Sequence, residues 1–162
     1  MKKDKVFTHF DANGKAIMVD ISDKENTERL ATASTSISMN KKTLQMIKEG
    51  TSKKGDVIGI ARLAGIMAAK KTSDLIPLCH PVSLASISVN FDIKENLNTI
   101  KITANCKLNG KTGLEMEALT AVSIAALTIY DMCKAVDREM IISETQLLFK
   151  SGGKSGTFNR ND

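Results

Sequence analysis

The sequence predicts an α+β fold, a ferredoxin-like β-α-β-β-α-β sandwich with an antiparallel sheet and its helices on one face. Apolar and polar residues alternate over 87–93 and again over 100–106, on either side of the polar stretch 95–98, as in a hairpin with one buried face. The same alternation runs through 31–39. The stretch 118–130 is almost entirely apolar, which indicates a helix covered on most sides.

The N-terminal part adds two elements to this pattern. A turn is expected at 11–14, followed by a short edge strand over 17–21. After the strand at 31–39, Asn40 is expected to cap a short extra helix that ends before Gly50.

The remaining elements follow from caps, prolines and periodicity. Asp56 is expected to cap a longer helix that runs from Val57 to about residue 74. The only two prolines, Pro77 and Pro81, then stiffen a non-helical segment. Residues 140–150 show little alternation and predict a last strand that is buried on both faces.

Length and composition fit one domain that spans residues 1–162, in which residues 1–8 and 151–162 are expected to be mobile. No apolar run approaches the length of a membrane span, and the basic N-terminus lacks the apolar region of a signal peptide. We therefore expect a cytoplasmic protein without a membrane partner.

Charge and aromatic content narrow the class of partner. A net charge of +5 favours an anionic partner, either nucleic acid or a phosphorylated small molecule. Five Phe, one Tyr and no Trp provide few stacking platforms for single-stranded nucleic acid. The three cysteines are widely spaced and indicate neither a disulfide framework nor a zinc module. A phosphorylated small molecule is the expected partner.

The predicted central helix carries charges at both ends. Asp131 and Lys134 share one helix face, whereas Glu117 lies fourteen residues before Asp131, about 21 Å away along a helix. If both ends serve one site, the second end must come from another copy of the chain, packed antiparallel. The alternative is that Asp131 and Lys134 form an ordinary surface pair.

His80 lies between the two prolines, where the backbone would hold its imidazole still. Such a side chain suits proton transfer near neutral pH, and the alternative is a structural loop histidine. Cys79 and His80 are adjacent, so their side chains diverge, and no metal site is expected.

Basic residues suggest where phosphates would bind. Lys54 precedes the helix that Asp56 caps and, together with Arg29, could hold an anion. The tail around Gly153 and Lys154 lacks the first glycine of a phosphate-binding loop, because Leu148 stands there. We expect instead a glycine-rich flap whose lysines close over a polyanion.

Long motifs at these positions resemble a known family. The motifs are KGDV from Lys54, AAKKTSDLIPLCHP from Ala68, KTGLEMEALTAVSIAALTIYDMCKAV from Lys111 and KSGGKSG from Lys150. They are similar to those of the cyclic pyranopterin monophosphate synthase family (MoaC) of molybdenum cofactor biosynthesis, and the likeness covers nearly the whole chain.

The resemblance implies a lyase. Its substrate would be 3',8-cyclo-7,8-dihydro-GTP, which is rearranged to cyclic pyranopterin monophosphate while pyrophosphate leaves. It also implies a homohexamer built as a trimer of dimers, with the site at a subunit interface. No organic cofactor is expected, and Mg²⁺ accompanying the triphosphate stays open. The alternative is a non-catalytic protein that binds a phosphorylated pterin.

Residue roles carried over from the resemblance stay expectations. They are Asp131 and Lys134 as the central catalytic pair; Lys54 as catalytic or phosphate-binding; Arg29, His80, Lys150 and Lys154 as contacts to the triphosphate or the flap; Glu115, Met116 and Glu117 as the base pocket; and Leu78 and Cys79 as further substrate-binding residues.

Overall fold

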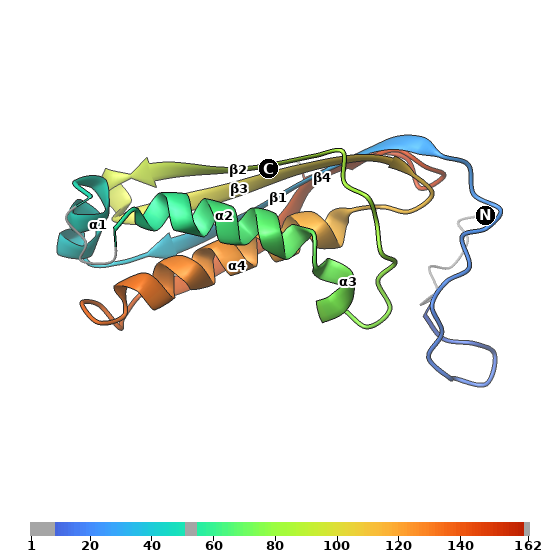
Figure 1. The fold of residues 1–162 in the computed structure, drawn as a ribbon, viewed down its shortest axis with the longest axis horizontal. Helices are drawn as coiled ribbons and strands as arrows, with labels where there is room; N and C mark the ends of the chain where they lie inside the picture. The colour runs from blue at the N-terminus through green and yellow to red at the C-terminus, as the bar shows by residue number, and fades with distance from the viewer. Residues whose placement is uncertain (1–8, 51–54, 161–162) are drawn as a thin grey trace.

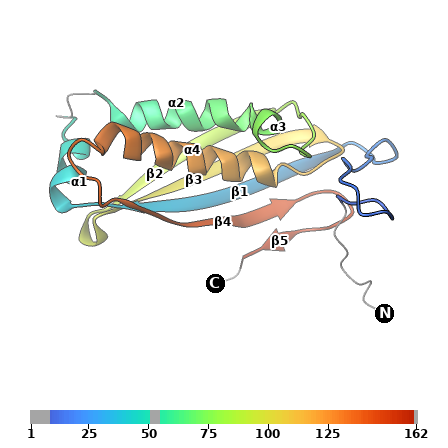
Figure 2. The ribbon, with the colours of Figure 1, turned by 90° about the horizontal axis from the view of Figure 1, so that it is seen from below.

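The computed structural model describes residues 9–50 and 55–160, which form one five-stranded antiparallel sheet with helices on one face (Figure 1, Figure 2). The expectation that residues 1–8 are mobile falls outside the described residues. The elements are β1 (Thr27–Ser38), α1 (Lys41–Lys48), α2 (Val57–Ala69), α3 (Thr72–Leu75), β2 (Ser86–Lys94), the 3₁₀ turn η1 (Glu95–Leu97), β3 (Thr99–Gly110), α4 (Glu115–Cys133), β4 (Ile141–Ser151) and β5 (Phe158–Asn159).

The strand order is β2-β3-β1-β4-β5, and every pairing is antiparallel. Its first four strands have the order of the ferredoxin-like sandwich, so the predicted fold class is confirmed. The central strand β1 shows why the alternation was informative. Ala31, Ala33 and Ile37 are buried on its helix-covered face, and Ile37 lies opposite Ile100 of β3 and Ile142 of β4.

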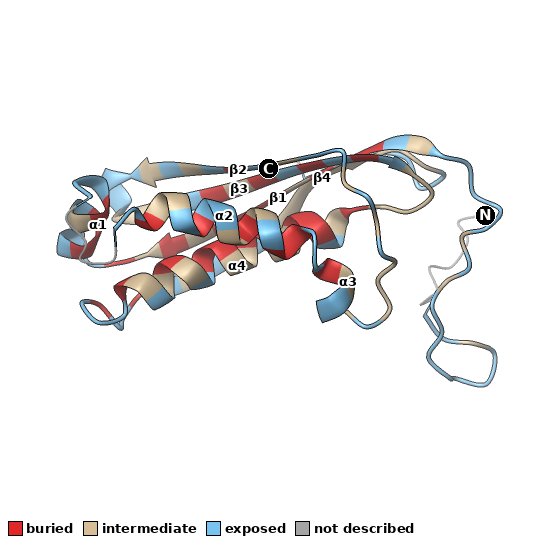
Figure 3. Ribbon diagram, in the orientation of Figure 1, coloured by how far each residue is buried: buried red, intermediate tan, exposed pale blue. Residues whose placement is uncertain are grey.

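Helix α4 lies against the sheet and packs on α2, β1, β3 and β4 (Figure 3). Its inner face is built mostly of small residues, which allow the helix backbone to approach the strands closely. Of the described helices, only α4 is long and apolar enough to cross a membrane, and half of that stretch is buried inside the fold. The buried apolar residues are Ala118, Ala121, Val122, Ala125, Ala126, Ile129 and Cys133.

Gly65 allows α2 to approach α4 closely. A Cβ atom at Gly65 would lie 2.9 Å from the carbonyl oxygen of Ala121 and 3.3 Å from the Cβ of Ala125. Because helix backbone cannot move aside cheaply, we expect Gly65→Ala to lower the free energy of unfolding by about 1–3 kcal/mol, as overpacked cores do. Urea unfolding followed by circular dichroism measures this, and an unchanged midpoint would show that the two helices have room to separate.

Helix α1 begins where the sequence predicted, but its cap is different. Asn40 occupies the N-cap position and makes no side-chain capping bond. The carboxylate of Asp137, from the loop after α4, instead accepts from the Asn40 amide at 2.8 Å and from the Thr43 hydroxyl at 3.1 Å. Burial alone would raise the pKa of Asp137, but these hydrogen bonds, with one from the Glu139 amide, hold it below its usual value.

Three local predictions were wrong. Residues 17–21 form no strand; the nearest pairing is an isolated bridge between Phe10 and Ala16. The helix predicted from Val57 to about residue 74 breaks after Ala69, where the Thr72 hydroxyl bonds back to the Ala69 carbonyl at 3.0 Å and a separate turn, α3, begins.

The third concerns β4, which is not buried on both faces: every residue from Ile141 to Ser151 is half-buried or exposed. Glu144 has a φ of 54° inside this strand, and the register against β1 shifts between Ser34 and Ser36. This irregularity disrupts the alternation, so the weak alternation of residues 140–150 does not indicate burial on both faces.

Candidate functional site

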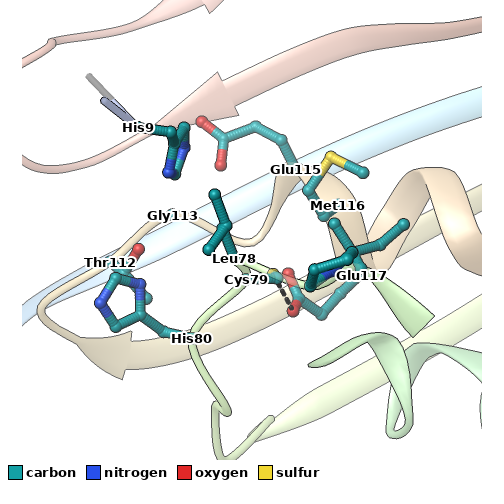
Figure 4. Close-up of a pocket in the computed structure, with 11 residues that line it drawn as sticks. His9, Leu78, Cys79, His80, Thr112, Gly113, Glu115, Met116 and Glu117 are labelled. Carbon is teal, nitrogen blue, oxygen red and sulfur yellow. Dashed lines mark hydrogen bonds between the residues drawn. The ribbon is translucent and has the colours of Figure 1, made fainter. Parts of the chain in front are cut away.

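A cavity of about 450 Å³ opens at the end of the molecule where α4 begins (Figure 4). Such a volume suits a small ligand or cofactor. Three separate segments line it: His9 near the N-terminus, residues 76–80, and residues 112–117. It therefore brings together six residues predicted to bind substrate: Leu78, Cys79, His80, Glu115, Met116 and Glu117.

Local structure explains how the walls form. Strand β3 ends at Gly110, and the buried Leu114 fixes the start of α4, so that Glu115 and Glu117 lie in the first turn of the helix. The opposite wall follows α3, because Pro77 requires an extended residue before it and Ile76 is extended, at φ −110° and ψ 108°. Backbone N–H groups at the start of α4 favour anionic or acceptor groups of a ligand.

Glu117 is the most deeply buried polar side chain of the cavity, at 1% exposure. The Cys79 thiol donates to its Oε1 at 3.8 Å, while Oε2 has no partner among the described residues. Burial raises the pKa of Glu117, and burial together with the Glu117 carboxyl raises the pKa of Cys79 to about 11. The pair thus leaves one buried carboxyl oxygen of Glu117, at the wall of the cavity, without a hydrogen-bond partner in the described part of the chain.

The raised pKa of Glu117 predicts a dependence of stability on pH. Between the carboxyl's unfolded pKa and its higher folded pKa, the native state binds more protons than the unfolded state, so stability falls as pH rises through this window. We expect Glu117→Gln to remove this decline, so that the variant gains thermal stability relative to wild type from pH 5 to pH 8. Thermal unfolding at both pH values tests this, and parallel midpoints would show that Glu117 ionises normally.

Basic side chains surround two hollows next to this cavity. One, of about 490 Å³, is lined by Lys24, Arg29 and Lys154. A smaller one, of about 120 Å³, adds Lys111 and Lys150 and shares Thr112, Gly113 and Glu115 with the cavity itself. The predicted residues Arg29, Lys150 and Lys154 therefore lie together beside the cavity, where positive charge would attract a polyanion.

Arg29 is buried, at 8% exposure, and its guanidinium group donates hydrogen bonds to backbone carbonyl groups. Its Nε donates to the Gly110 carbonyl at 2.9 Å and its Nη2 to the Lys111 carbonyl at 3.1 Å. A Cβ atom at Gly153 would lie 2.1 Å from the Arg29 Nη1, and both Gly152 and Gly153 have positive φ. The glycine-rich segment thus packs directly on Arg29, in a backbone conformation that favours glycine.

Asp131 and Lys134 lie at the opposite end of α4, as Figure 1 shows for the helix itself. The Lys134 Nζ is 2.6 Å from the Asp131 Oδ1, and both side chains are more than half exposed. Along α4 this pair is about 21 Å from Glu117. One copy of the chain therefore does not bring the pair to the cavity. Lys54 lies outside the described residues, and the helix that follows it, α2, begins near this same end.

The side chains that the fold brings to this region and that sequence reasoning missed include His9, Lys24, Lys111 and Thr112. Lys111 and Thr112 stand inside a recognised motif and could have been named from it. His9 and Lys24 belong to irregular segments that carry no periodicity, so only the folded chain reveals their positions.

Comparisons with known proteins identify relatives of the whole chain. The model of the MoaC family matches residues 18–153. The chain is also similar to the cyclic pyranopterin monophosphate synthase of Clostridium perfringens (strain 13 / Type A), with 56% identity over 156 residues, which cover 96% of this chain and 99% of the relative.

Proposed function

The chain belongs to the MoaC family, and we propose that it converts 3',8-cyclo-7,8-dihydro-GTP to cyclic pyranopterin monophosphate with release of pyrophosphate. The observation that carries this function is the 56% identity, over nearly the full length, to a protein of that activity. The chain is therefore a lyase of molybdenum cofactor biosynthesis that acts on a small molecule.

The geometry supports a division of the substrate between two regions. The base would occupy the cavity, where Leu78 and Met116 offer apolar contact and the buried Oε2 of Glu117, unpartnered among the residues that the structure describes, offers a hydrogen bond. The triphosphate would extend past Thr112 into the smaller basic hollow, which Lys150 lines, and from there toward Lys154 in the larger one. Both regions share one wall, so a single ligand can reach both.

The catalytic pair would come from a second copy of the chain. Glu117 and Asp131 each lie seven residues from Ile124, so two copies of α4 packed antiparallel about a two-fold axis at Ile124 would place Asp131 of one copy beside Glu117 of the other. The outer face of α4 suits such a contact, because Ile124 is half-buried and Leu127 is 53% exposed. Two equivalent sites would form in each dimer.

In this arrangement Asp131 and Lys134 supply acid/base chemistry close to the ribose end of the base. A hydroxyl group of the sugar would give its proton to this acid/base pair and attack the α-phosphorus to form the cyclic phosphate, and the bond from that phosphorus to the bridging oxygen of the β-phosphate would break. Pyrophosphate would leave with both electrons of that bond, its charge balanced by Lys54, Lys150 and Lys154.

Other features of the proposal rest on the family resemblance. The dimers would assemble three to a homohexamer. The conversion changes no oxidation state and would need no organic cofactor, while Mg²⁺, where present, would enter with the triphosphate. The protein would act in the cytoplasm, without nucleic acid or membrane as a partner.

The deciding experiment incubates the purified, EDTA-treated protein with 3',8-cyclo-7,8-dihydro-GTP and follows pyrophosphate and the pterin product together. We expect wild type to release both in equal amounts and Lys134→Ala to release neither. Tight binding by wild type without either product would instead support a non-catalytic protein that binds phosphorylated pterins.

A further inference from the structure

An N-terminal strap, defined as residues 9–22, lies along the end of the molecule that holds the cavity (Figure 1). Its first part folds back on itself, with the Ile17 amide donating to the His9 carbonyl at 3.0 Å and the Gly14 amide donating to the Asp11 carbonyl at 3.0 Å. This small loop fixes the backbone of His9, whose side chain lines the cavity.

Two hydrogen bonds hold the strap, one from His80 in the cavity wall and one from Lys111, the residue before the opposite wall. His80 Nε2 lies 2.7 Å from the Val19 carbonyl, and Lys111 Nζ donates to the Ser22 carbonyl at 2.6 Å. His80 belongs to the wall that follows α3, whereas Lys111 begins the segment that leads into α4. The strap is therefore a part of the site rather than a loose tail.

The two histidines of the chain differ in whether their ring nitrogens are already hydrogen-bonded within the protein. A carbonyl oxygen only accepts, so the His80 Nε2 must carry a proton and is committed to Val19. Within the described residues, His9 makes no side-chain hydrogen bond, so both of its ring nitrogens are available to a ligand. Figure 4 draws the His9 ring and the Glu115 carboxylate at the same side of the cavity.

We propose that His9 is a substrate-contacting residue of the cavity, and that His80 is a positioning residue that holds the strap, and with it His9, through the Val19 carbonyl. This rests on the proposed function, since the ligand is the base of the GTP-derived substrate. A purine-derived base offers ring nitrogens, an amino group and a carbonyl, and an imidazole can donate to or accept from these groups. His9 and Glu117 reach the cavity from different segments, so together they would fix the orientation of the base.

Steady-state kinetics of four variants separate the two roles. We expect His9→Ala to raise KM about tenfold with a smaller change in kcat, as for a contact made equally in ground state and transition state. His80→Asn should raise KM similarly, because its shorter amide cannot reach Val19. His80→Gln should recover much of the affinity, because its amide nitrogen extends to nearly the position of Nε2. Lys15→Ala, an exposed residue of the same strap, serves as the control and should match wild type.

A second measurement does not depend on turnover. Carbethoxylation, mapped by mass spectrometry, measures how readily each imidazole reacts with and without the cyclic dihydro-GTP substrate. The Lys134→Ala variant is used because it is expected not to consume the substrate during labelling. We expect His9 to react in the free protein and to be protected by the substrate. His9→Gln, checked by circular dichroism, confirms the assignment of the modified site.

The outcomes separate this proposal from the function on which it rests. A wild type that releases no pyrophosphate would overturn the function. A wild type that turns over, with His9→Ala unchanged and His9 unprotected, would overturn the role of His9 alone. Equal loss of kcat in His80→Asn and His80→Gln would show that His80 transfers protons itself and would overturn its positioning role.

Discussion

Lys134→Ala and Asp131→Asn are each expected to lower kcat by about 10²–10⁴-fold, the usual contribution of a positioned acid or base. Both side chains are exposed at the end of α4, at 53% and 66% respectively, so neither substitution removes packing. Pyrophosphate release measures the effect, and sedimentation should show an unchanged assembly.

The control for this prediction is a matched ion pair. Lys94 and Asp92 also lie 2.6 Å apart with exposed side chains, but in strand β2, away from α4. Lys94→Ala should therefore leave kcat unchanged. Near-normal turnover in Lys134→Ala would show that Asp131 and Lys134 form only an ordinary surface ion pair.

Lys134→Ala, combined with Glu117→Ala, tests whether two copies share one site; we expect Glu117→Ala to be inactive as well, because it removes the carboxyl group that would bind the base. Lys134→Ala and Glu117→Ala damage opposite ends of α4, so in mixed dimers one site carries both changes and the other carries neither. With random pairing, co-expression of the two inactive chains should restore about a quarter of wild-type activity, since half of the dimers have one intact site. No recovery would mean that each copy builds its own site.

Leu127→Glu is expected to dissociate the dimer and to abolish turnover with it. Leu127 is 53% exposed on the outer face of α4, so a glutamate there is solvated in the single chain. In the proposed antiparallel contact the same carboxylate would be buried near its symmetry mate, which is strongly unfavourable for two unpaired charges. Sedimentation velocity and pyrophosphate release measure the two effects together.

Leu97→Glu is the matched control, because Leu97 is 64% exposed in the turn between β2 and β3 and carries the same change. It should leave the sedimentation coefficient and turnover unaltered. If Leu127→Glu sedimented as the same assembly as wild type and released pyrophosphate at the same rate, with a native circular dichroism spectrum, the dimer interface would not involve α4.

The fold could be predicted because β2 and β3 each keep one face exposed to solvent, which produces an alternating sequence pattern. The alternation in β2 and β3 reflects a sheet whose helices cover one side only, and the apolar content of α4 reflects its position over β1 and β3. The prediction failed where side chains override periodicity. Thr72 ends α2 early by bonding to the preceding turn, and the bulge at Glu144 hides the true exposure of β4.

The candidate site was predictable to the extent that it lies in regular elements. Residues at the two ends of α4 could be named, and their separation along the helix followed from its geometry. The contact between His80 and Val19 could not be predicted, because Val19 lies in an irregular segment far from His80 in sequence. Neither hydrophobic pattern nor turn chemistry specifies such a contact.

The pairing of β1 with β4 has a consequence for how the chain matures. Leu30 lies opposite Ser151, so one edge of the central strand stays open until residues 141–151 have left the ribosome. During that interval β1 exposes unpaired backbone groups, which are a template for association with other nascent chains. Translation that stops before residue 141 should therefore yield aggregates rather than a soluble fragment, because β4, the strand that covers this edge of β1, has not yet been synthesised.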